Sequence, residues 1–165
     1  MRAGDVTPPR DDYHRCVLRA LGVPASDALL ADLCRPLESP PVRLFDDVFE
    51  ALDSLLDRGV RMAVVSDTWI ETPAMCAQLG LTPYFSAYVI FEALGCRKPD
   101  ARMYAAGRDA LGLAANERLF VDDTPALVHA AIALGYEGAV IDRSAAARAL
   151  GIATISDLRI LTSLF

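Results

Sequence analysis

Short, uninterrupted apolar runs alternate with helical patterns from residue 61 to residue 141, and this alternation limits the possible folds more than any other feature. The pattern predicts strands at 61–66, 87–91, 118–121 and 138–141 and helices at 72–79, 100–111 and 125–134. Strands that lack an alternating polar face are buried on both sides, as in a parallel sheet covered by helices. We therefore expect an α/β fold, a three-layer α/β/α sandwich around a doubly wound parallel sheet.

The residues before this region predict helices joined by proline-containing connections. Apolar spacing favours helices at 11–21, 26–35 and 46–58. We expect residues 1–43 to form an N-terminal segment with a small helical cap, and residues 44–165 to form the α/β core. The carboxylates of Asp46 and Asp47 are expected to cap the third helix. From Ser144 onward, we expect one short helix and a loosely packed end.

The amino-acid composition and net charge indicate which kinds of partner the protein can bind. Of the 165 residues, 53% are apolar, and the net charge is −6. This length and apolar content fit one globular domain with a sizeable core. The negative charge disfavours nucleic acids and anionic membranes as partners. Because the four cysteines lack paired spacing and the sequence shows neither a signal peptide nor a membrane span, we expect a reduced, cytoplasmic protein.

Lys98 stands out because it is the only lysine of the chain; the other positively charged side chains are all arginine. An ammonium supplies a compact point charge that a planar guanidinium does not. Ser66 ends one predicted strand, Asp122 and Asp123 follow another, and Lys98 follows a third. The carboxyl ends of parallel strands share one edge of a sheet, so these groups should converge there. A hydroxyl, a lysine and paired carboxylates are the parts of a phosphate and metal site.

Each of these residues also has an interpretation without function. Ser66 could cap a turn, and Lys98 could be an ordinary surface residue. Asp122 and Asp123 could cap the helix that follows them. Two adjacent carboxylates after a buried strand repel each other, however, and a cation relieves that repulsion. The ordered set is more specific than its members, which favours the functional interpretation.

Three segments of the sequence resemble the haloacid dehalogenase-like hydrolase superfamily, within a match over about residues 45–142. The second, third and fourth motifs of that family correspond in order to Val64-Val65-Ser66, Arg97-Lys98-Pro99-Asp100 and Phe120-Val121-Asp122-Asp123. The resemblance implies the α/β/α sandwich already expected from the pattern. It also implies roles for particular side chains.

The implied roles divide into phosphate binding, metal binding and catalysis. Ser66, Asp67 and Lys98 correspond to phosphate-binding positions, and Asp122 and Asp123 to the ligands of Mg²⁺. Lys98, Ser66 and Asp122 correspond to the catalytic positions present in this sequence. The family activity would be that of a Mg²⁺-dependent phosphomonoester phosphatase acting on a small phosphorylated molecule. Dehalogenation also occurs in this superfamily, but the acid pair disfavours it.

The first motif of the family, which carries an aspartate nucleophile at the end of a central strand, is not found. One alignment of Met1–Thr7 puts Arg2 at the nucleophile position; another puts Ala3 there and Asp5 at the second acid. Two hypotheses follow. Either the reading frame starts internally and the chain is truncated, or it is a pseudoenzyme, a non-catalytic phosphate- and metal-binding or regulatory protein on the same scaffold.

A missing first strand has a structural consequence as well. In the family's sheet it would lie between the strands at 61–65 and 118–121, whose facing edges would otherwise be exposed. We expect these two strands to pair directly, or to borrow a strand or surface from a second copy in a homodimer, or the chain to fold poorly.

Overall fold

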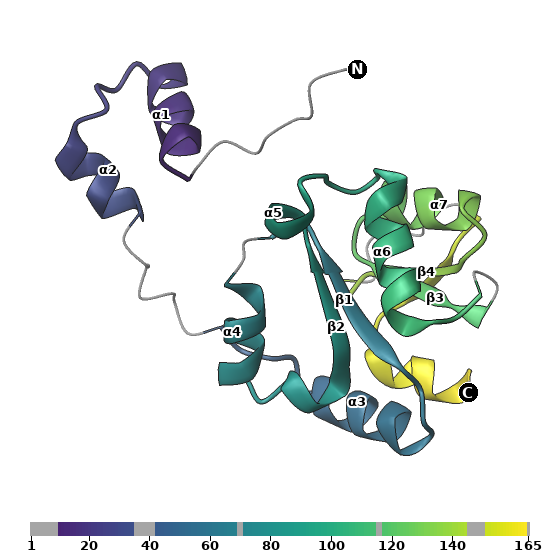
Figure 1. The fold of residues 1–165 in the computed structure, drawn as a ribbon. Helices are drawn as coiled ribbons and strands as arrows, with labels where there is room; N and C mark the ends of the chain where they lie inside the picture. The colour runs from purple at the N-terminus through teal and green to yellow at the C-terminus, as the bar shows by residue number, and fades with distance from the viewer. Residues whose placement is uncertain (1–9, 35–41, 69–70, 115–116, 145–150, 165) are drawn as a thin grey trace. The chain divides into compact units, whose positions relative to one another are not determined.

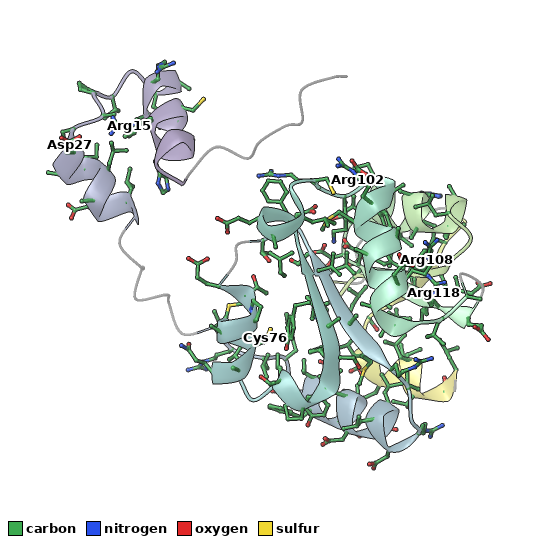
Figure 2. The ribbon with its side chains drawn as sticks, viewed as in Figure 1. Arg15, Asp27, Cys76, Arg102, Arg108 and Arg118 are labelled. Carbon is green, nitrogen blue, oxygen red and sulfur yellow. The ribbon has the colours of Figure 1, made fainter. Side chains whose placement is uncertain are left out.

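The computed structural model describes residues 10–34, 42–68, 71–114, 117–144 and 151–164. The chain divides into two compact units, Met1–Arg43 and Leu44–Phe165. In the first, helices α1 (Arg10–Ala20) and α2 (Asp27–Cys34) contact each other and bury Leu18 and Leu30. The Arg15 guanidinium lies 3.6 Å from the Asp27 carboxylate across this helix pair (Figure 2). Both helices were predicted; the role of the first unit as a cap stays a prediction.

The second unit contains two parallel sheets, shown in Figure 1. Strand β1 (Met62–Ser66) pairs with β2 (Phe85–Ile90), and β4 (Glu137–Ile141) lies between β3 (Leu119–Asp122) and β5 (Ala153–Ile155). Every pairing is parallel, as the continuous apolar runs predicted.

Helices cover both faces of these strands. The second unit contains α3 (Val48–Asp57), α4 (Thr72–Gln78), α5 (Phe91–Leu94), α6 (Ala101–Leu111) and α7 (Pro125–Ala133), with 3-10 segments η1 (Thr82–Tyr84) and η3 (Leu158–Ser163). Helix α6 contacts β1 and β2, α7 contacts β3 and β4, and η3 lies beside α3 (Figure 1). The predicted three-layer α/β/α architecture is confirmed. None of the helices in the described residues has the length and apolarity needed to cross a membrane.

The two helical layers each span both sheets. On one face, Val65 of β1 packs against a cluster that contains Tyr104 of α6 and Phe120 of β3. On the opposite face, Met62 of β1 and Val121 of β3 pack against one cluster built on Leu55, Ile155 and Leu161. Alternate residues of a strand point to opposite faces, so each strand contributes to both cores. Shared helical layers therefore hold the two sheets in one unit.

Within the described residues, β1 and β3 form no strand pairing with each other. Direct pairing of the strands at 61–65 and 118–121, one of the outcomes expected from the sequence, is therefore not observed. The two sheets remain separate along these edges (Figure 1).

The C-terminal segment differs from its prediction. Instead of a loosely packed end after Ser144, it forms the strand β5 and the 3-10 segment η3. Ile155 and Leu161 are buried in the core beneath α3. The three-residue β5 is too short, and at its first two positions too exposed, to show a strand pattern in the sequence.

Asp47 also differs from its prediction as a helix cap. It occupies the N-cap position of α3, but its side chain makes no capping hydrogen bond. Its carboxylate accepts hydrogen bonds from Arg143 Nη1 at 2.9 and 3.0 Å and from the Leu158 N–H at 2.7 Å. The side chain is only 3% exposed. Burial raises the pKa of Asp47, but the bonds to Arg143 and Leu158 outweigh this effect and lower it below its ordinary value of 3.8.

We predict that Asp47→Ala lowers the free energy of unfolding by about 3 kcal/mol, because it leaves the Arg143 guanidinium without its buried partner. Asp46→Ala, at the exposed neighbouring position, should change it by less than about 0.5 kcal/mol. Denaturant unfolding of both variants measures the difference. Equal stabilities would show that the buried pair does not anchor the C-terminal segment.

The same contact should depend on pH. A carboxylate whose pKa is lower in the folded than in the unfolded protein stabilises the fold above the unfolded pKa and loses that contribution as pH falls through the folded value. The advantage of the wild type over Asp47→Asn in thermal unfolding should therefore shrink as the pH falls below about 4. A constant difference across that range would contradict the lowered pKa.

Candidate functional site

Lys98 joins the carboxyl ends of β1 and β3. Its backbone N–H donates to Asp67 Oδ1, one residue beyond β1, at 2.9 Å. Its ammonium Nζ donates to Asp122 Oδ2, the last residue of β3, at 2.6 Å. Since one lysine contacts both, the carboxyl ends of β1 and β3 lie close together. Of the residues expected to converge, Lys98 and Asp122 are in direct contact, and Lys98 reaches the end of β1 through Asp67, the residue after Ser66.

The Lys98–Asp122 ion pair is largely removed from solvent. The two side chains are 8% and 11% exposed. The other Asp122 oxygen, Oδ1, accepts a hydrogen bond from the Thr124 N–H at 2.9 Å, and the Lys98 ammonium lies 5.6 Å from the centre of the Phe120 ring. A charge pair held this way needs good geometry to offset its desolvation. The position of the ammonium is therefore fixed by the fold.

Three hydroxyl groups gather after β1. The Thr68 hydroxyl donates to Ser66 Oγ at 2.9 Å, and the Thr68 and Thr72 hydroxyls lie 2.7 Å apart. Ser66 was a predicted site residue, whereas Thr68 and Thr72 were not. The one sequence signal that could have identified Thr68 is its position two residues after Ser66. Hydroxyls both donate and accept, so this cluster can reorient its protons toward an anion.

The loop that carries Lys98 is fixed at both ends. Gly95 adopts φ 71°, a left-handed conformation that glycine adopts without steric cost, where α5 ends. Asp100 caps α6 by accepting from the Arg102 N–H at 2.9 Å, and it also pairs with the Arg102 guanidinium at 2.7 Å. The hydrogen bond from Arg102 lowers the pKa of Asp100 to about 2.

The carboxylates of Asp67 and Asp123 each contact a neighbouring residue, and among the described residues no hydrogen bond joins them to each other. The Asp67 carboxylate is directed at the Lys98 backbone, so its observed contact fixes the loop. Phosphate binding at Asp67 stays a prediction. Asp123 is exposed, and its Oδ1 accepts from the Thr124 hydroxyl at 3.2 Å.

Negative charge from Asp122 and Asp67 reaches the neighbouring Tyr104. The pKa of Tyr104 is raised to about 12, mainly by burial and then by the negative charges of Asp122 and Asp67. In the part of the chain that the structure describes, no group of three or more His, Cys, Asp or Glu side chains is placed to hold a metal. Mg²⁺ keeps several waters and commonly takes one or two carboxylates, so the Asp122–Asp123 pair fits it in ligand type. Arg2, Ala3 and Asp5, the candidates for the first motif, lie outside the described residues.

Comparison with known proteins relates the chain to hydrolases. The family model described as haloacid dehalogenase-like hydrolase matches residues 15–135. Haloacetate dehalogenase H-2 of Moraxella sp. (strain B) is 31% identical over 100 residues, covering 60% of this chain and 45% of that protein. Phosphatase MT3486 of Mycobacterium tuberculosis (strain CDC 1551 / Oshkosh) is 29% identical over 108 residues, which cover 63% of this chain and 49% of that protein. The chain thus spans about half the length of the curated relatives it matches.

A solved structure supports the fold. The HAD-hydrolase YfnB from Bacillus subtilis, solved bound to magnesium, superposes with a TM-score of 0.73 over 95% of this chain and 73% of that one. Its sequence is 18% identical, so this likeness concerns the fold alone. It agrees with the α/β architecture of the Leu44–Phe165 unit.

We predict that Asp67→Ala speeds hydrogen exchange of the Lys98 amide about tenfold, because the amide loses its acceptor. Asp67→Asn keeps an acceptor oxygen and should exchange nearly as slowly as the wild type. Asp100→Ala is the matched control, since Asp100 accepts from the Arg102 amide and not from that of Lys98. Amide exchange measured by NMR gives the rates. The same rate in wild type and Asp67→Ala would show that Asp67 does not hold the loop.

Proposed function

The chain belongs to the haloacid dehalogenase-like hydrolases, and from that premise we propose that it binds the phosphate group of a small phosphorylated molecule together with Mg²⁺. The observation that carries this proposal is the Lys98 ammonium, held where β1 and β3 end. A buried point charge with a fixed position recognises an anion at a defined distance. The hydroxyls of Ser66 and Thr68 add donors on the β1 side of the same site.

Phosphate fits this site better than a halogenated acid does. The curated relatives include a dehalogenase and a phosphatase, so likeness alone does not choose between them. The exposed Asp123 next to Asp122 favours a divalent cation, and phosphoryl groups are commonly bound with one. We therefore propose the phosphatase type of chemistry for the site rather than dehalogenation.

The proposed division of labour follows from the contacts. Ser66 binds a phosphate oxygen through its hydroxyl, and Lys98 neutralises phosphate charge through Nζ. Asp122 and Asp123 hold Mg²⁺, which when bound supplies positive charge that stabilises the phosphoryl group. Asp67 positions Lys98 by accepting from its backbone N–H.

The alternative is phosphate and metal binding without turnover. Covalent catalysis in this class needs a carboxylate free to attack phosphorus. In the described residues of the site, Asp122 is paired with Lys98, Asp67 with the Lys98 backbone, and Asp123 is assigned to Mg²⁺. Hydrolysis would therefore use a carboxylate from outside these residues. We expect the 165-residue chain to bind phosphate but to be a poor phosphatase.

Lys98→Arg should weaken vanadate binding about tenfold although the charge is retained, because a guanidinium cannot replace a buried ammonium that reaches Asp122. Lys98→Met should abolish binding. Arg97→Lys is the matched control: Arg97 is exposed and stacks on Phe91, and its replacement should change affinity less than about twofold. Titration calorimetry with vanadate and Mg²⁺ measures each affinity.

Unchanged affinity in Lys98→Arg would return Lys98 to a structural role. A hydrolysis assay of the same wild-type protein distinguishes binding alone from turnover. Robust Mg²⁺-dependent hydrolysis of a generic phosphomonoester by the wild type would rule out binding without turnover and show that a nucleophile is present.

Asp123→Asn should weaken Mg²⁺ binding about tenfold, because a neutral amide replaces one of the proposed ligands. Thermal stability should change little, since Asp123 is exposed and its observed contact is with the adjacent Thr124. Calorimetric titration with Mg²⁺ compares this variant with Asp109→Asn, an exposed carboxylate on α6 paired with Arg108. Equal Mg²⁺ affinities in all three proteins would remove the metal assignment.

A further inference from the structure

Tyr104 links the helices that follow the two loops of the candidate site. Its side chain is among the most deeply buried in the protein, at 1% exposed. It lies on α6, which begins just after the Lys98 loop, and its hydroxyl donates to the Leu127 carbonyl at 2.9 Å. Leu127 lies in the first turn of α7, which begins just after Asp122 and Asp123. One hydroxyl therefore connects the element behind the lysine to the element behind the paired acids.

Thr124 contacts both carboxylates of the acid pair. Its N–H donates to Asp122 Oδ1 at 2.9 Å, and its hydroxyl donates to Asp123 Oδ1 at 3.2 Å. Thr124 occupies the N-cap position of α7, but its side chain makes no capping hydrogen bond to that helix. The position of Thr124 therefore determines where the two carboxylates point.

The backbone of Thr124 is held in turn by the first turn of α7. Its carbonyl accepts hydrogen bonds from the Leu127 N–H at 3.0 Å and from the Val128 N–H at 3.3 Å. Leu127 is the residue whose carbonyl accepts from Tyr104. A continuous series of hydrogen bonds thus runs from the Tyr104 hydroxyl through Leu127 and Thr124 to Asp122. The other oxygen of Asp122 accepts from the Lys98 ammonium.

The ring of Tyr104 reaches the lysine by a separate route. The centres of the Tyr104 and Phe120 rings lie 5.1 Å apart, and the Lys98 ammonium lies 5.6 Å from the centre of the same Phe120 ring. Phe120 therefore lies between Tyr104 and Lys98. The hydroxyl and the ring of one side chain support opposite partners of the Lys98–Asp122 ion pair.

Burial alone does not account for the hydroxyl of Tyr104. A buried tyrosine needs a hydrogen-bond partner, and the Leu127 carbonyl supplies one. A carbonyl in the first turn of a helix, however, already accepts from the N–H four residues later. Phenylalanine at position 104 would fill the same apolar cluster and leave the Leu127 carbonyl with its helical partner. The hydroxyl adds a tether between α6 and α7 that the apolar core does not require.

We infer, resting on the proposed function, that Tyr104 is a positioning residue for the Mg²⁺ ligands Asp122 and Asp123. It touches neither phosphate nor cation. Its hydroxyl holds the turn from Asp122 to Leu127 and so fixes the two carboxylates relative to Lys98. Ligands that are already ordered lose less conformational freedom on binding, which raises affinity. Without the hydroxyl the chain should still fold, but its acid pair should be less ordered.

The first test is made on the metal-free protein. Tyr104→Phe removes only the hydroxyl. We expect the Thr124 amide to exchange about fivefold faster than in the wild type, because the turn that holds it against Asp122 loses one anchoring bond. The Arg102 amide, which donates to Asp100 at the start of α6, should exchange at an unchanged rate. An unchanged Thr124 rate, measured by NMR, would overturn the inference whether or not Mg²⁺ binds.

The second test measures Mg²⁺ affinity by titration calorimetry. Tyr104→Phe should weaken binding about fivefold. Tyr136→Phe is the matched control, because this hydroxyl also donates to a backbone carbonyl, that of Tyr104, at 2.6 Å. It accepts from Arg118, labelled in Figure 2, at 3.1 Å, and its ring packs against the same apolar cluster. Neither bond reaches the turn from Asp122 to Leu127, so affinity should change less than about twofold.

Thermal unfolding of the two variants separates positioning from stability. Tyr136→Phe breaks two hydrogen bonds and should lower the melting temperature at least as much as Tyr104→Phe does. Equal Mg²⁺ affinity in the wild type and Tyr104→Phe would overturn the inference. Equal weakening in both variants would do the same, since it would mean a general loosening of the cluster. A wild type that binds no Mg²⁺ would reject the proposed function, and amide exchange would still decide whether Tyr104 holds the turn.

The wild type alone gives the answer if Tyr104→Phe does not fold. Because Thr124 and Leu127 belong to one hydrogen-bonded turn, added Mg²⁺ should slow exchange of both amides together. Slowing at Thr124 without any change at Leu127 would show that the series of bonds ends before Tyr104, and would overturn its positioning role.

Discussion

The contacts of Lys98 are the constraint on which the arrangement of the two sheets depends. Among the described residues, no backbone pairing joins β1 to β3, so the ladder that normally unites an α/β layer is interrupted there. At the carboxyl ends, Lys98 replaces it: the backbone bonds to Asp67 after β1, and the side chain bonds to Asp122 at the end of β3. These two hydrogen bonds connect segments that are 31 and 24 residues away in the sequence. The proposed ligand site and the junction between the sheets are thus the same place.

Apolar side chains on both faces also join the two sheets. Val65 packs with Tyr104 and Phe120 on one face, and Met62 packs with Val121 on the other. The buried Asp47 then ties the start of α3 to Arg143 and to the Leu158 backbone, more than 90 residues later in the chain. The charged contacts lie at element ends, where backbone groups need partners, and apolar contacts fill the space between. This distribution explains how a unit with two separate sheets has one connected interior.

The sequence predicted the parts of this fold whose signals are local. Strands such as β1 are continuous apolar runs, and helices such as α6 begin at a capping residue, Asp100, that is visible in the sequence. Strand β5 was missed because only Ile155 of its three residues is buried. Asp47 was misassigned because its position before a helix suits a cap, while its real partner, Arg143, is set by tertiary packing. In the site, the identities of Lys98 and Asp122 were predictable from strand ends; the turn of Asp67 onto the Lys98 backbone was not, because it depends on the path of the loop.

The charge of the site indicates why an anion and a cation should bind there together. The carboxylates of Asp67, Asp122 and Asp123 follow the ends of β1 and β3, and the Lys98 ammonium contacts one of them, that of Asp122. Arg97 adds little, because its guanidinium stacks over the Phe91 ring at 4.1 Å. A phosphate dianion approaching this set alone would meet repulsion, and Lys98 could turn to it only by weakening its bond to Asp122. In the proposed site Asp122 and Asp123 would hold Mg²⁺, which would supply positive charge beside these carboxylates and leave Lys98 to the phosphate. Under the proposed function, the Lys98–Asp122 ion pair is the contact that must weaken before the ammonium can bind a phosphate.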